Sequence, residues 1–285
     1  MKILATRRFP GEAWDELPDV EIGPLEPRDD VDVLIVANEA VDFAAFPALR
    51  LIANFSVGYD RIDVAGARER GIAVTNTPGV LDAAVADLTF GLIIAARRRI
   101  VEGDAHVRSG AWESGWAAGP FLGREVTGAT LGIVGYGRIG RAVARRAQGF
   151  EMRVLHTRET PLEQLLAESD VVTVHVPLSP ETTGLISRGR LALLADGATL
   201  VNTARGAVVD EEALIDELER GRLSAGLDVF AHEPHVPERL RGLPNVVLTP
   251  HIASAAVETR AAMTRIVVDN VLAYARGEEL PTRVV

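Results

Sequence analysis

TLGIVGYGRIG, residues 130–140, places a glycine-rich turn between an apolar run and the start of a helical pattern. Its glycines Gly135, Gly137 and Gly140 follow the spacing G-x-G-x-x-G. In that spacing the first glycine makes a tight turn, the second lets the backbone approach a pyrophosphate, and the third lets helix and strand pack closely. Because strand, glycine turn and helix follow one another here, the stretch predicts a dinucleotide site with the phosphates at the helix N-terminus.

The next apolar run, RVLHT from Arg153, bears on which dinucleotide binds. An acidic residue about 20 residues further on normally binds the ribose hydroxyls of NAD. This run leads instead into Thr157 and Arg158. Thr157 is uncharged, whereas an acidic residue at this position would repel a 2′-phosphate. The guanidinium of Arg158 is suited to binding such a phosphate. We therefore favour NADP as the cofactor, with NAD possible if Arg158 is a solvated loop residue.

Short apolar runs alternate with amphipathic stretches on both sides of the glycine turn. Four runs before residue 79 and six after residue 125 are typical of buried strands, and helical patterns separate most of them. This alternation indicates parallel sheets with helices on both faces. The runs are KILAT (2–6), VDVLIVA (31–37), LRLIANFSV (49–57), IAVTNT (72–77), TLGIVGYG (130–137), RVLHT (153–157), DVVTVHVP (170–177), TLVNTARG (199–206), SAGLDVF (224–230) and VVLTPH (246–251).

Two longer helical patterns, residues 81–101 and 254–276, lie between the strand sets and after the last strand. We interpret them as inter-domain helices, so that the C-terminal tail returns to the first domain. A dinucleotide-binding domain of residues 79–255 then interrupts a substrate domain of residues 1–78 and 256–285. The predicted fold class is α/β, with two doubly wound parallel-sheet domains: a Rossmann-type cofactor domain inserted in a flavodoxin-like substrate domain.

Composition excludes several classes of function. The net charge of −10 over 285 residues argues against nucleic acid as a partner, because such binding needs a basic face. No apolar run approaches the ~20 residues that span a membrane, and the N-terminus lacks the apolar segment of a signal peptide, so we expect a cytoplasmic protein. The chain has no cysteine, and Lys2 is its one lysine, which excludes thiolate sites and argues against a P-loop or a lysine Schiff base.

Arg205, Asp228 and His251 each end an apolar run, and Glu233 follows Asp228 closely. Carboxyl ends of parallel strands face the ligand crevice, so we expect these side chains at the edge where the dinucleotide binds. We also expect His251 to begin the long helical pattern that follows it. The segment HEPH (232–235) misses the H-E-x-x-H spacing, and its proline would disrupt the helix that aligns two histidines, so no metal site is predicted.

These residues lie within motifs that resemble those of the D-isomer-specific 2-hydroxyacid dehydrogenases. The resemblance extends over nearly the whole length of the chain. Two details of the sequence are similar to the glyoxylate/hydroxypyruvate reductase branch of that family. They are the residues before His251 and the absence of an acidic residue at the position of Thr157. The motifs that carry the resemblance are NFSVGYDRID (54–63), TNTPGVL (75–81), GIVGYGRIGRAVA (132–144), HVPLSPET (175–182), VNTARGAVVDEEAL (201–214), GLDVF (226–230), EP (233–234) and TPHIAS (249–254).

The resemblance implies a role for each matching residue. Arg205 holds the substrate carboxylate and polarises the keto oxygen, His251 protonates that oxygen, and Glu233 orients the imidazole and favours its charged form. The backbone amides of Val57 and Gly58 form a carboxylate cradle. The implied cofactor contacts are Gly135, Gly137, Arg138, Ile139, Gly140, Thr157, Arg158, His175, Pro177, Thr182, Thr203, Ala204, Asp228 and Ser254.

We interpret the chain as an oxidoreductase that transfers hydride from NAD(P)H to C2 of a small 2-keto acid, giving a D-2-hydroxy acid. Two alternatives remain: an NAD-linked enzyme for a bulkier aromatic or branched 2-keto acid, and a non-catalytic dinucleotide sensor on the same fold. We expect a homodimer, because residues 110–123 occupy the place where family members extend an arm to a partner subunit. No membrane or nucleic-acid partner is expected.

Overall fold

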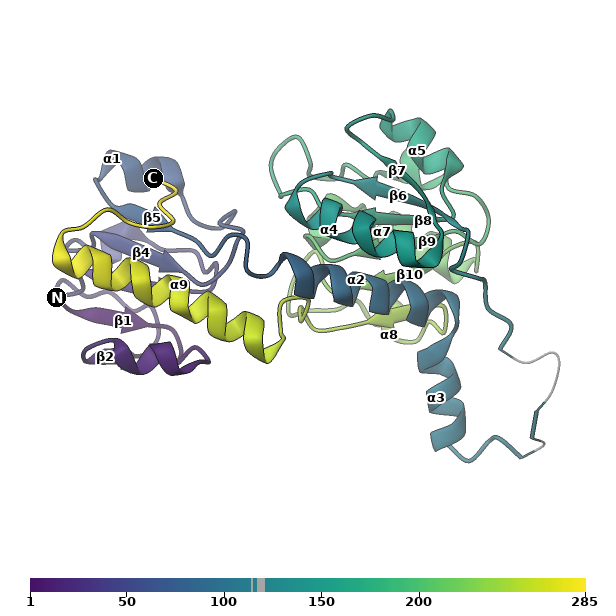
Figure 1. Ribbon diagram of the computed structural model, residues 1–285, viewed down its shortest axis with the longest axis horizontal. Coiled ribbons are helices and arrows are strands. Elements are labelled where there is room, and N and C mark those ends of the chain that lie inside the picture. Colours follow the sequence, from purple (N-terminus) through teal and green to yellow (C-terminus); the bar gives the residue numbers. More distant parts are fainter. Residues whose placement is uncertain (114, 117–120) are drawn as a thin grey trace. The chain divides into compact units, whose positions relative to one another are not determined.

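The computed structural model describes residues 1–113, 115–116 and 121–285, and it divides into two compact units (Figure 1). Unit 1 comprises Met1–Leu81 and Ser254–Val285, and unit 2 comprises Asp82–Ala253. Residues 114 and 117–120 of the predicted arm lie outside the described residues. In the described part of the chain, no helix is long and apolar enough to cross a membrane. The assignment of substrate to one unit and cofactor to the other stays a prediction.

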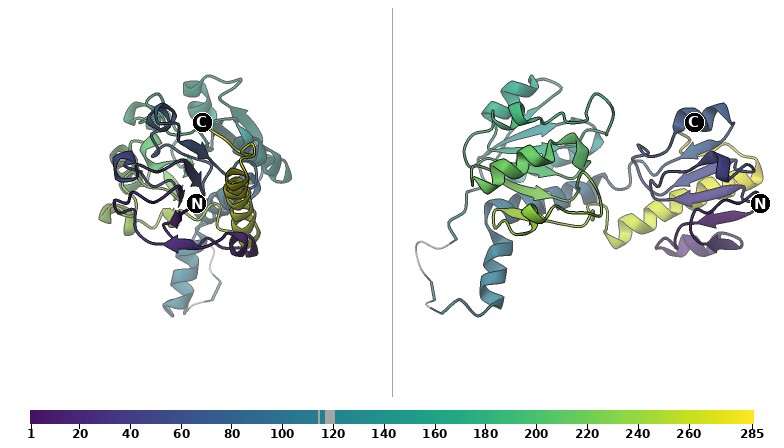
Figure 2. Two further views of the ribbon diagram at one scale, coloured as in Figure 1. Left: turned by 90° about the vertical axis from the view of Figure 1, so that its left-hand side faces the viewer. Right: turned by 180° about the vertical axis from the view of Figure 1, so that it is seen from behind.

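Unit 1 is a parallel five-stranded sheet with the order β2-β1-β3-β4-β5, which is the flavodoxin-like order. The strands are fully buried where they are apolar, as in β3 and β4, and helix α9 packs against β4 (Figure 2). The elements are β1 Ile3–Ala5, β2 Val20–Ile22, β3 Val33–Val36, β4 Leu51–Asn54, β5 Ala73–Thr75, α1 Val64–Glu69, α9 Val257–Arg276 and the 3₁₀ turns Glu12–Glu16 and Phe43–Ala45.

Unit 2 is a parallel six-stranded sheet with the order β11-β10-β9-β8-β6-β7. The strands are β6 Thr130–Val134, β7 Arg153–His156, β8 Val171–Val174, β9 Thr199–Asn202, β10 Ser224–Leu227 and β11 Val246–Leu248. The helices are α2 Asp82–Arg97, α3 Ile100–Arg108, α4 Arg138–Ala147, α5 Leu162–Glu168, α6 Arg188–Leu191, α7 Glu211–Glu219 and α8 Glu238–Arg241, with 3₁₀ turns at Gln148–Phe150 and Gly206–Val208.

Apolar clusters cover both faces of the unit 2 sheet. Side chains of α2 and α4 pack on one face and those of α5, α6 and α7 on the other. The chain runs from β6 to β7 at one side and then to β8 at the other, so a topological switch point lies beside β6. The predicted fold class of two parallel-sheet α/β units is therefore confirmed, although one strand rather than the two of the classic dinucleotide order lies beyond β6.

Three local expectations were wrong. Strand β2 is absent from the predicted set because its three residues, VEI, are partly or fully exposed and form no apolar run. The helix predicted over residues 81–101 is two helices, because Arg124 N donates to Arg97 O (2.8 Å) and Arg99 adopts a left-handed backbone between α2 and α3. His251 does not begin a helix: α9 starts six residues later, at Val257, and His251 lies in the turn after β11.

Candidate active site

The glycine turn joins β6 to α4 in unit 2, and its three glycines meet different surroundings. A Cβ on Gly135, whose φ is +98°, would lie 2.5 Å from His175 O, and one on Gly140 would lie 2.2 Å from Gly135 O. A Cβ on Gly137 would meet no atom within 4 Å. The outer glycines are thus required by packing, while Gly137 borders open space at the N-terminus of α4, beside Arg138 and Ile139. This arrangement fits a bound pyrophosphate.

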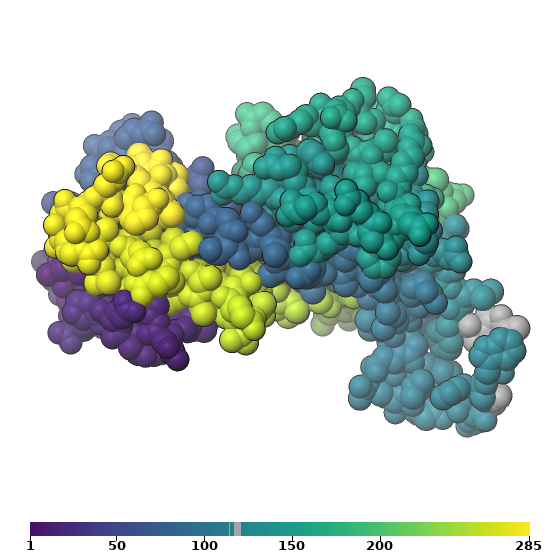
Figure 3. Space-filling view, in the orientation of Figure 1, coloured from purple at the N-terminus to yellow at the C-terminus, as the bar shows by residue number. Residues whose placement is uncertain are grey.

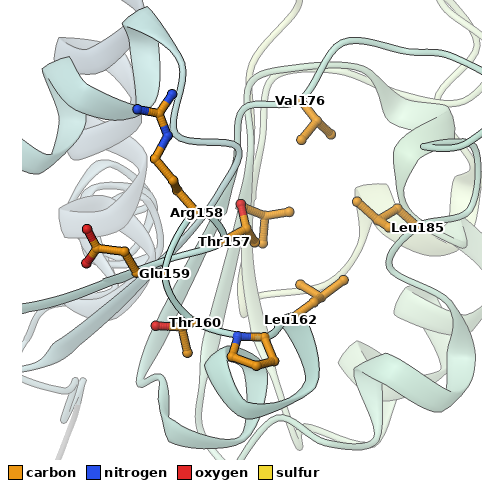
Figure 4. A pocket seen from close by; sticks show the side chains of 9 residues that line it. Thr157, Arg158, Glu159, Thr160, Leu162, Val176 and Leu185 are labelled. Atoms are coloured by element: carbon orange, nitrogen blue, oxygen red, sulfur yellow. The ribbon is translucent and has the colours of Figure 1, made fainter.

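A pocket of about 400 Å³ lies beside this turn, at the ends of β6 and β7. Val176, Leu162 and Leu185 give it an apolar wall, with Thr157 at its centre (Figure 4). Thr157 Oγ1 accepts a hydrogen bond from Gly135 N (3.0 Å), which ties the end of β7 to the glycine turn. Arg158 lines the same pocket, and its size and apolar wall suit the adenosine part of a dinucleotide.

The pocket also includes Glu159, which sequence reasoning missed. No carboxylate ends β7, but Glu159 follows Arg158 and places an acid at the pocket rim. Its Oε2 lies 3.6 Å from His156 Nε2, and its side chain is 78% exposed. Its position three residues past the strand was the available signal, and this carboxylate bears directly on the choice between NADP and NAD.

Five of the expected cofactor contacts lie in the turns after β8 and β9: His175, Pro177, Thr182, Thr203 and Ala204. His175 follows β8, its Nε2 lies 2.9 Å from Thr173 Oγ1, and burial lowers the pKa of its ring to about 3, so the imidazole is neutral at neutral pH. Thr182 Oγ1 donates to Pro177 O (2.6 Å) and closes the next turn. Thr203 Oγ1 is buried against Thr89 Oγ1 (3.1 Å), and Ala204 follows it.

Three adjacent strands carry two candidate catalytic residues and one expected cofactor contact at their carboxyl ends. Arg205 follows β9, Asp228 follows β10, and His251 follows β11, in a sheet where β9, β10 and β11 are consecutive neighbours. Glu233 arrives from the turn after Asp228. The sheet topology therefore gathers four residues that are separated by up to 46 positions in the chain.

His251 and Glu233 form a hydrogen-bonded pair, with 2.8 Å between Nδ1 and Oε2. Glu233 Oε1 accepts from Phe230 N (3.1 Å), which fixes the carboxylate. Burial raises the pKa of Glu233, but the hydrogen bond and charge of His251, the Phe230 amide and the charge of Arg205 outweigh burial, so the net pKa is lowered. The imidazole is 48% exposed, and within the described residues its Nε2 bonds to no protein atom, which leaves that nitrogen available to a ligand.

The backbone of His251 has a positive φ of +55°, and Asp228 holds it there. His251 N donates to Asp228 O (2.9 Å). The buried carboxylate of Asp228 accepts from Thr249 Oγ1 (2.5 Å), Ile252 N (2.8 Å) and Ala253 N (2.8 Å). A left-handed histidine is uncommon, and such conformations persist only where the surroundings determine them. Asp228 therefore shapes the turn that presents His251, while its predicted contact with the nicotinamide stays a prediction.

Two neighbours of Arg205 position its turn, and sequence reasoning missed both. The Asn202 side chain accepts from Ala204 N (3.0 Å) and donates to Arg205 O (2.9 Å), a local side-chain-to-backbone pattern that its place at the strand end could have signalled. A Cβ on Gly206 would lie 1.9 Å from the carbonyl carbon of Phe230. Only glycine lets the Arg205 turn touch the turn that leads to Glu233.

The predicted site residues Val57, Gly58 and Ser254 belong to unit 1. Val57 and Gly58 lie in the turn after β4, and Ser254 precedes α9. Among the described residues, no group of three or more His, Cys, Asp or Glu side chains is arranged to hold a metal ion.

Comparison with known proteins identifies the family. Residues 90–253 match the family model described as D-isomer specific 2-hydroxyacid dehydrogenase, NAD binding domain. The glyoxylate reductase of Pyrococcus furiosus is 48% identical, over 99% of this chain and 90% of that protein. Among solved structures, the TT0316 protein of Thermus thermophilus has a TM-score of 0.93 and 46% identity, with 100% of both chains covered.

A second solved structure bears on the branch of the family. The NADPH-dependent glyoxylate/hydroxypyruvate reductase of Sinorhizobium meliloti, in complex with NADP and malonate, has a TM-score of 0.88 and 36% identity, covering 100% of this chain and 96% of that one. Together with the glyoxylate reductase of Pyrococcus furiosus, it confirms the resemblance stated on the sequence motifs. The chain therefore belongs to the D-isomer-specific 2-hydroxyacid dehydrogenases, a family of NAD(P)-dependent oxidoreductases.

Proposed function

We propose that this protein reduces small 2-keto acids of the glyoxylate and hydroxypyruvate type to D-2-hydroxy acids, with NADPH as its preferred reductant. The His251–Glu233 pair, 2.8 Å long and next to the Arg205 turn, is the observation that carries the proposal. An imidazole hydrogen-bonded to a carboxylate at one nitrogen and open at the other has the arrangement of a general acid. The similarity to glyoxylate reductases supports the substrate class.

In this reaction the reduced nicotinamide supplies hydride to C2 of the keto acid. Negative charge then develops on the keto oxygen, and a nearby cation and a proton donor stabilise it. Arg205 provides the cation and binds the substrate carboxylate, while His251 Nε2 donates the proton. Glu233 accepts from Nδ1, which fixes the tautomer and stabilises the imidazolium before it gives up its proton. The amides of Val57 and Gly58 also bind the substrate carboxylate.

The NADPH preference rests on Thr157 and Arg158, which both line the pocket. A charge-assisted hydrogen bond from Arg158 to a 2′-phosphate is worth about 1.5–3 kcal/mol, so kcat/KM with NADPH should exceed that with NADH by at least ~10-fold. Arg158→Ala should lower kcat/KM with NADPH and leave kcat/KM with NADH unchanged. Thr157→Asp should weaken the binding of NADPH, because the new carboxylate repels the 2′-phosphate. Glu159→Gln should raise kcat/KM with NADPH, because it removes the one carboxylate among the residues that line this pocket.

Initial rates for a panel of 2-keto acids, each with NADH and with NADPH, test the whole proposal. Highest kcat/KM for glyoxylate or hydroxypyruvate with NADPH is the expected result. Faster turnover of phenylpyruvate or 2-ketoisocaproate with NADH would favour the NAD-linked alternative. Tight dinucleotide binding with no turnover of any keto acid would instead identify a sensor on this fold.

We also propose that the protein is a homodimer, and we keep its cytoplasmic location as a prediction. Helix α3 has no buried residue in the structure, and its apolar side chains Ile100, Val101 and Val107 are each more than half exposed. The helix projects from the body of unit 2 (Figure 3). Apolar side chains gathered on a projecting element are typical of a subunit interface.

A further inference from the structure

The turn after β4 in unit 1 has three successive carbonyl oxygens, those of residues 56–58, that each accept a hydrogen bond from an asparagine side chain. Ser56 O accepts from Thr77 N (3.0 Å) and from Asn54 Nδ2 (3.4 Å). Val57 O accepts from Asn76 Nδ2 (2.9 Å), and Gly58 O accepts from Asn54 Nδ2 (2.8 Å). Two asparagine side chains thus fix the main chain over residues 56–58.

Holding a carbonyl oxygen also aims the amide that follows it. A trans peptide is planar, so its C=O and N–H point in opposite directions. The bonds to Ser56 O and Val57 O therefore turn the N–H groups of Val57 and Gly58 away from Asn54 and Asn76. Within the described residues, those two N–H groups donate to no protein acceptor. Successive free amides that face one way form a concave site for an anion.

Both asparagines are themselves held by further contacts. Asn54 is fully buried at the end of β4, and its Oδ1 accepts from Asn38 N (2.8 Å). Thr282 in the C-terminal segment donates through Oγ1 to Asn76 O (2.6 Å) and accepts from Asn270 Nδ2 of α9 (2.9 Å). Asn38 therefore holds the side chain of Asn54, and the C-terminal segment holds the main chain of Asn76.

We propose that Asn54 and Asn76 are positioning residues that fix the peptide planes of residues 56–58, so that the Val57 and Gly58 amides converge on the substrate carboxylate. This inference rests on the proposed function, which supplies the carboxylate. Neither asparagine touches the substrate. They act by keeping two N–H groups unpaired and turned away from the asparagine side chains, an arrangement that an unconstrained turn would lose to water or to its own carbonyls.

Steady-state kinetics of Asn54→Ala and Asn76→Ala with NADPH and glyoxylate test this role. A carboxylate contact made equally in the bound substrate and in the transition state affects KM rather than kcat. We expect KM for glyoxylate, and the inhibition constant of the unreactive carboxylate oxamate, to rise by about tenfold or more in each variant, the size of one charge-assisted hydrogen bond. The turnover number should change by less than about threefold on the same grounds, and NADPH affinity should not change.

Asn245 of unit 2 supplies the matched control, since its side chain also donates to two main-chain carbonyls, Leu218 O (2.9 Å) and Leu223 O (2.8 Å). Asn245→Ala should leave KM and the oxamate constant unchanged even if it lowers the melting temperature. Asn76→Gln keeps the amide donor and should recover part of the lost affinity. If burial makes Asn54→Ala unstable, the partly exposed Asn76 carries the test.

Unchanged KM and oxamate inhibition in folded Asn76→Ala would overturn the positioning role, as would a fall in kcat with KM unaltered. A wild-type protein that neither reduces 2-keto acids nor binds oxamate would overturn the proposed function itself. The two failures are therefore distinguished by the wild-type assay.

Discussion

His251 shows how a single residue can carry a chemical and a conformational requirement together. Its ring needs Glu233 at Nδ1, and its backbone needs Asp228 to hold a positive φ. Histidine and a left-handed backbone at the same position restrict what can replace it. The sequence indicated the residue type and its place after a strand, but the turn that presents it depends on a carboxylate more than 20 positions away.

We expect His251→Ala to lower kcat by ~10²–10⁴, the contribution of a general acid, while NADPH affinity stays near that of the wild type. Turnover measurements with glyoxylate and fluorescence titration with NADPH separate the two effects. His235→Ala is the control, because His235 is exposed in the same region and is outside the proposed chemistry. Near-normal turnover of His251→Ala at neutral pH would show that another group donates the proton.

His175 makes the protein sensitive to acid. In the unfolded chain its ring gains a proton as pH falls through about 6.5, whereas the folded protein, where burial lowers the pKa to about 3, does not. The unfolded state then binds more protons, so the free energy of unfolding falls with pH between these values, by up to ~1.4 kcal/mol per unit. Urea unfolding of wild type and His175→Asn at pH 7.5, 6 and 5 should show the smaller pH dependence in the variant. Parallel curves would contradict this.

At the scale of elements, most of the two sheets was predictable because buried parallel strands are continuous apolar runs with helices between them. The strand that was not predicted, β2, is partly or fully exposed and forms no apolar run. The helix that was drawn too long, α2, ends where a distant amide binds its last carbonyl. Candidate catalytic residues were found from their place at strand ends. Their supports were not found: Asn202 could have been, from its place at the end of β9, but the contact of Gly206 is with a distant backbone atom that no sequence pattern identifies.

A substitution at Gly206 tests the contact between the turns after β9 and β10. Gly206→Ala places a methyl group against the backbone at Phe230, and overpacking of this kind costs about 1–3 kcal/mol. We expect a lower melting temperature and a loss of kcat as the Glu233 turn shifts. Gly189→Ala in α6, where a Cβ meets nothing within 4 Å, should be neutral or slightly stabilising. Equal behaviour of the two variants would show that the turns move apart freely.

For the whole molecule, the exposed apolar side chains of α3 are the feature that the described fold does not explain. Ile100 and Val107 lie seven positions apart, two helical turns, and so face the same way. Their exposed fractions are 51% and 56%. These exposed apolar side chains are the surface on which the proposed homodimer is tested.

Ile100→Glu combined with Val107→Glu should convert the dimer to a monomer, because two carboxylates would be buried without partners in the interface. Light scattering at micromolar concentration should give twice the chain mass for the wild type and a single chain mass for the variant, with NADPH binding retained. Arg68→Glu on α1 serves as the control for charge alone. A monomeric wild type would remove the dimer proposal.

Because unit 2 interrupts unit 1 in the sequence, unit 1 begins first but is completed last. The last residues form main-chain contacts with β5, through Val284 N to Val74 O (2.7 Å), and α9 packs on β4. During synthesis on the ribosome, residues 1–81 therefore wait without their covering helix while unit 2, an uninterrupted stretch of chain, acquires its whole sheet. The part of unit 1 that precedes unit 2 is therefore the last to be finished, and during that interval the apolar side chains of β3 and β4 lack the helix that packs on β4, which leaves them open to aggregation.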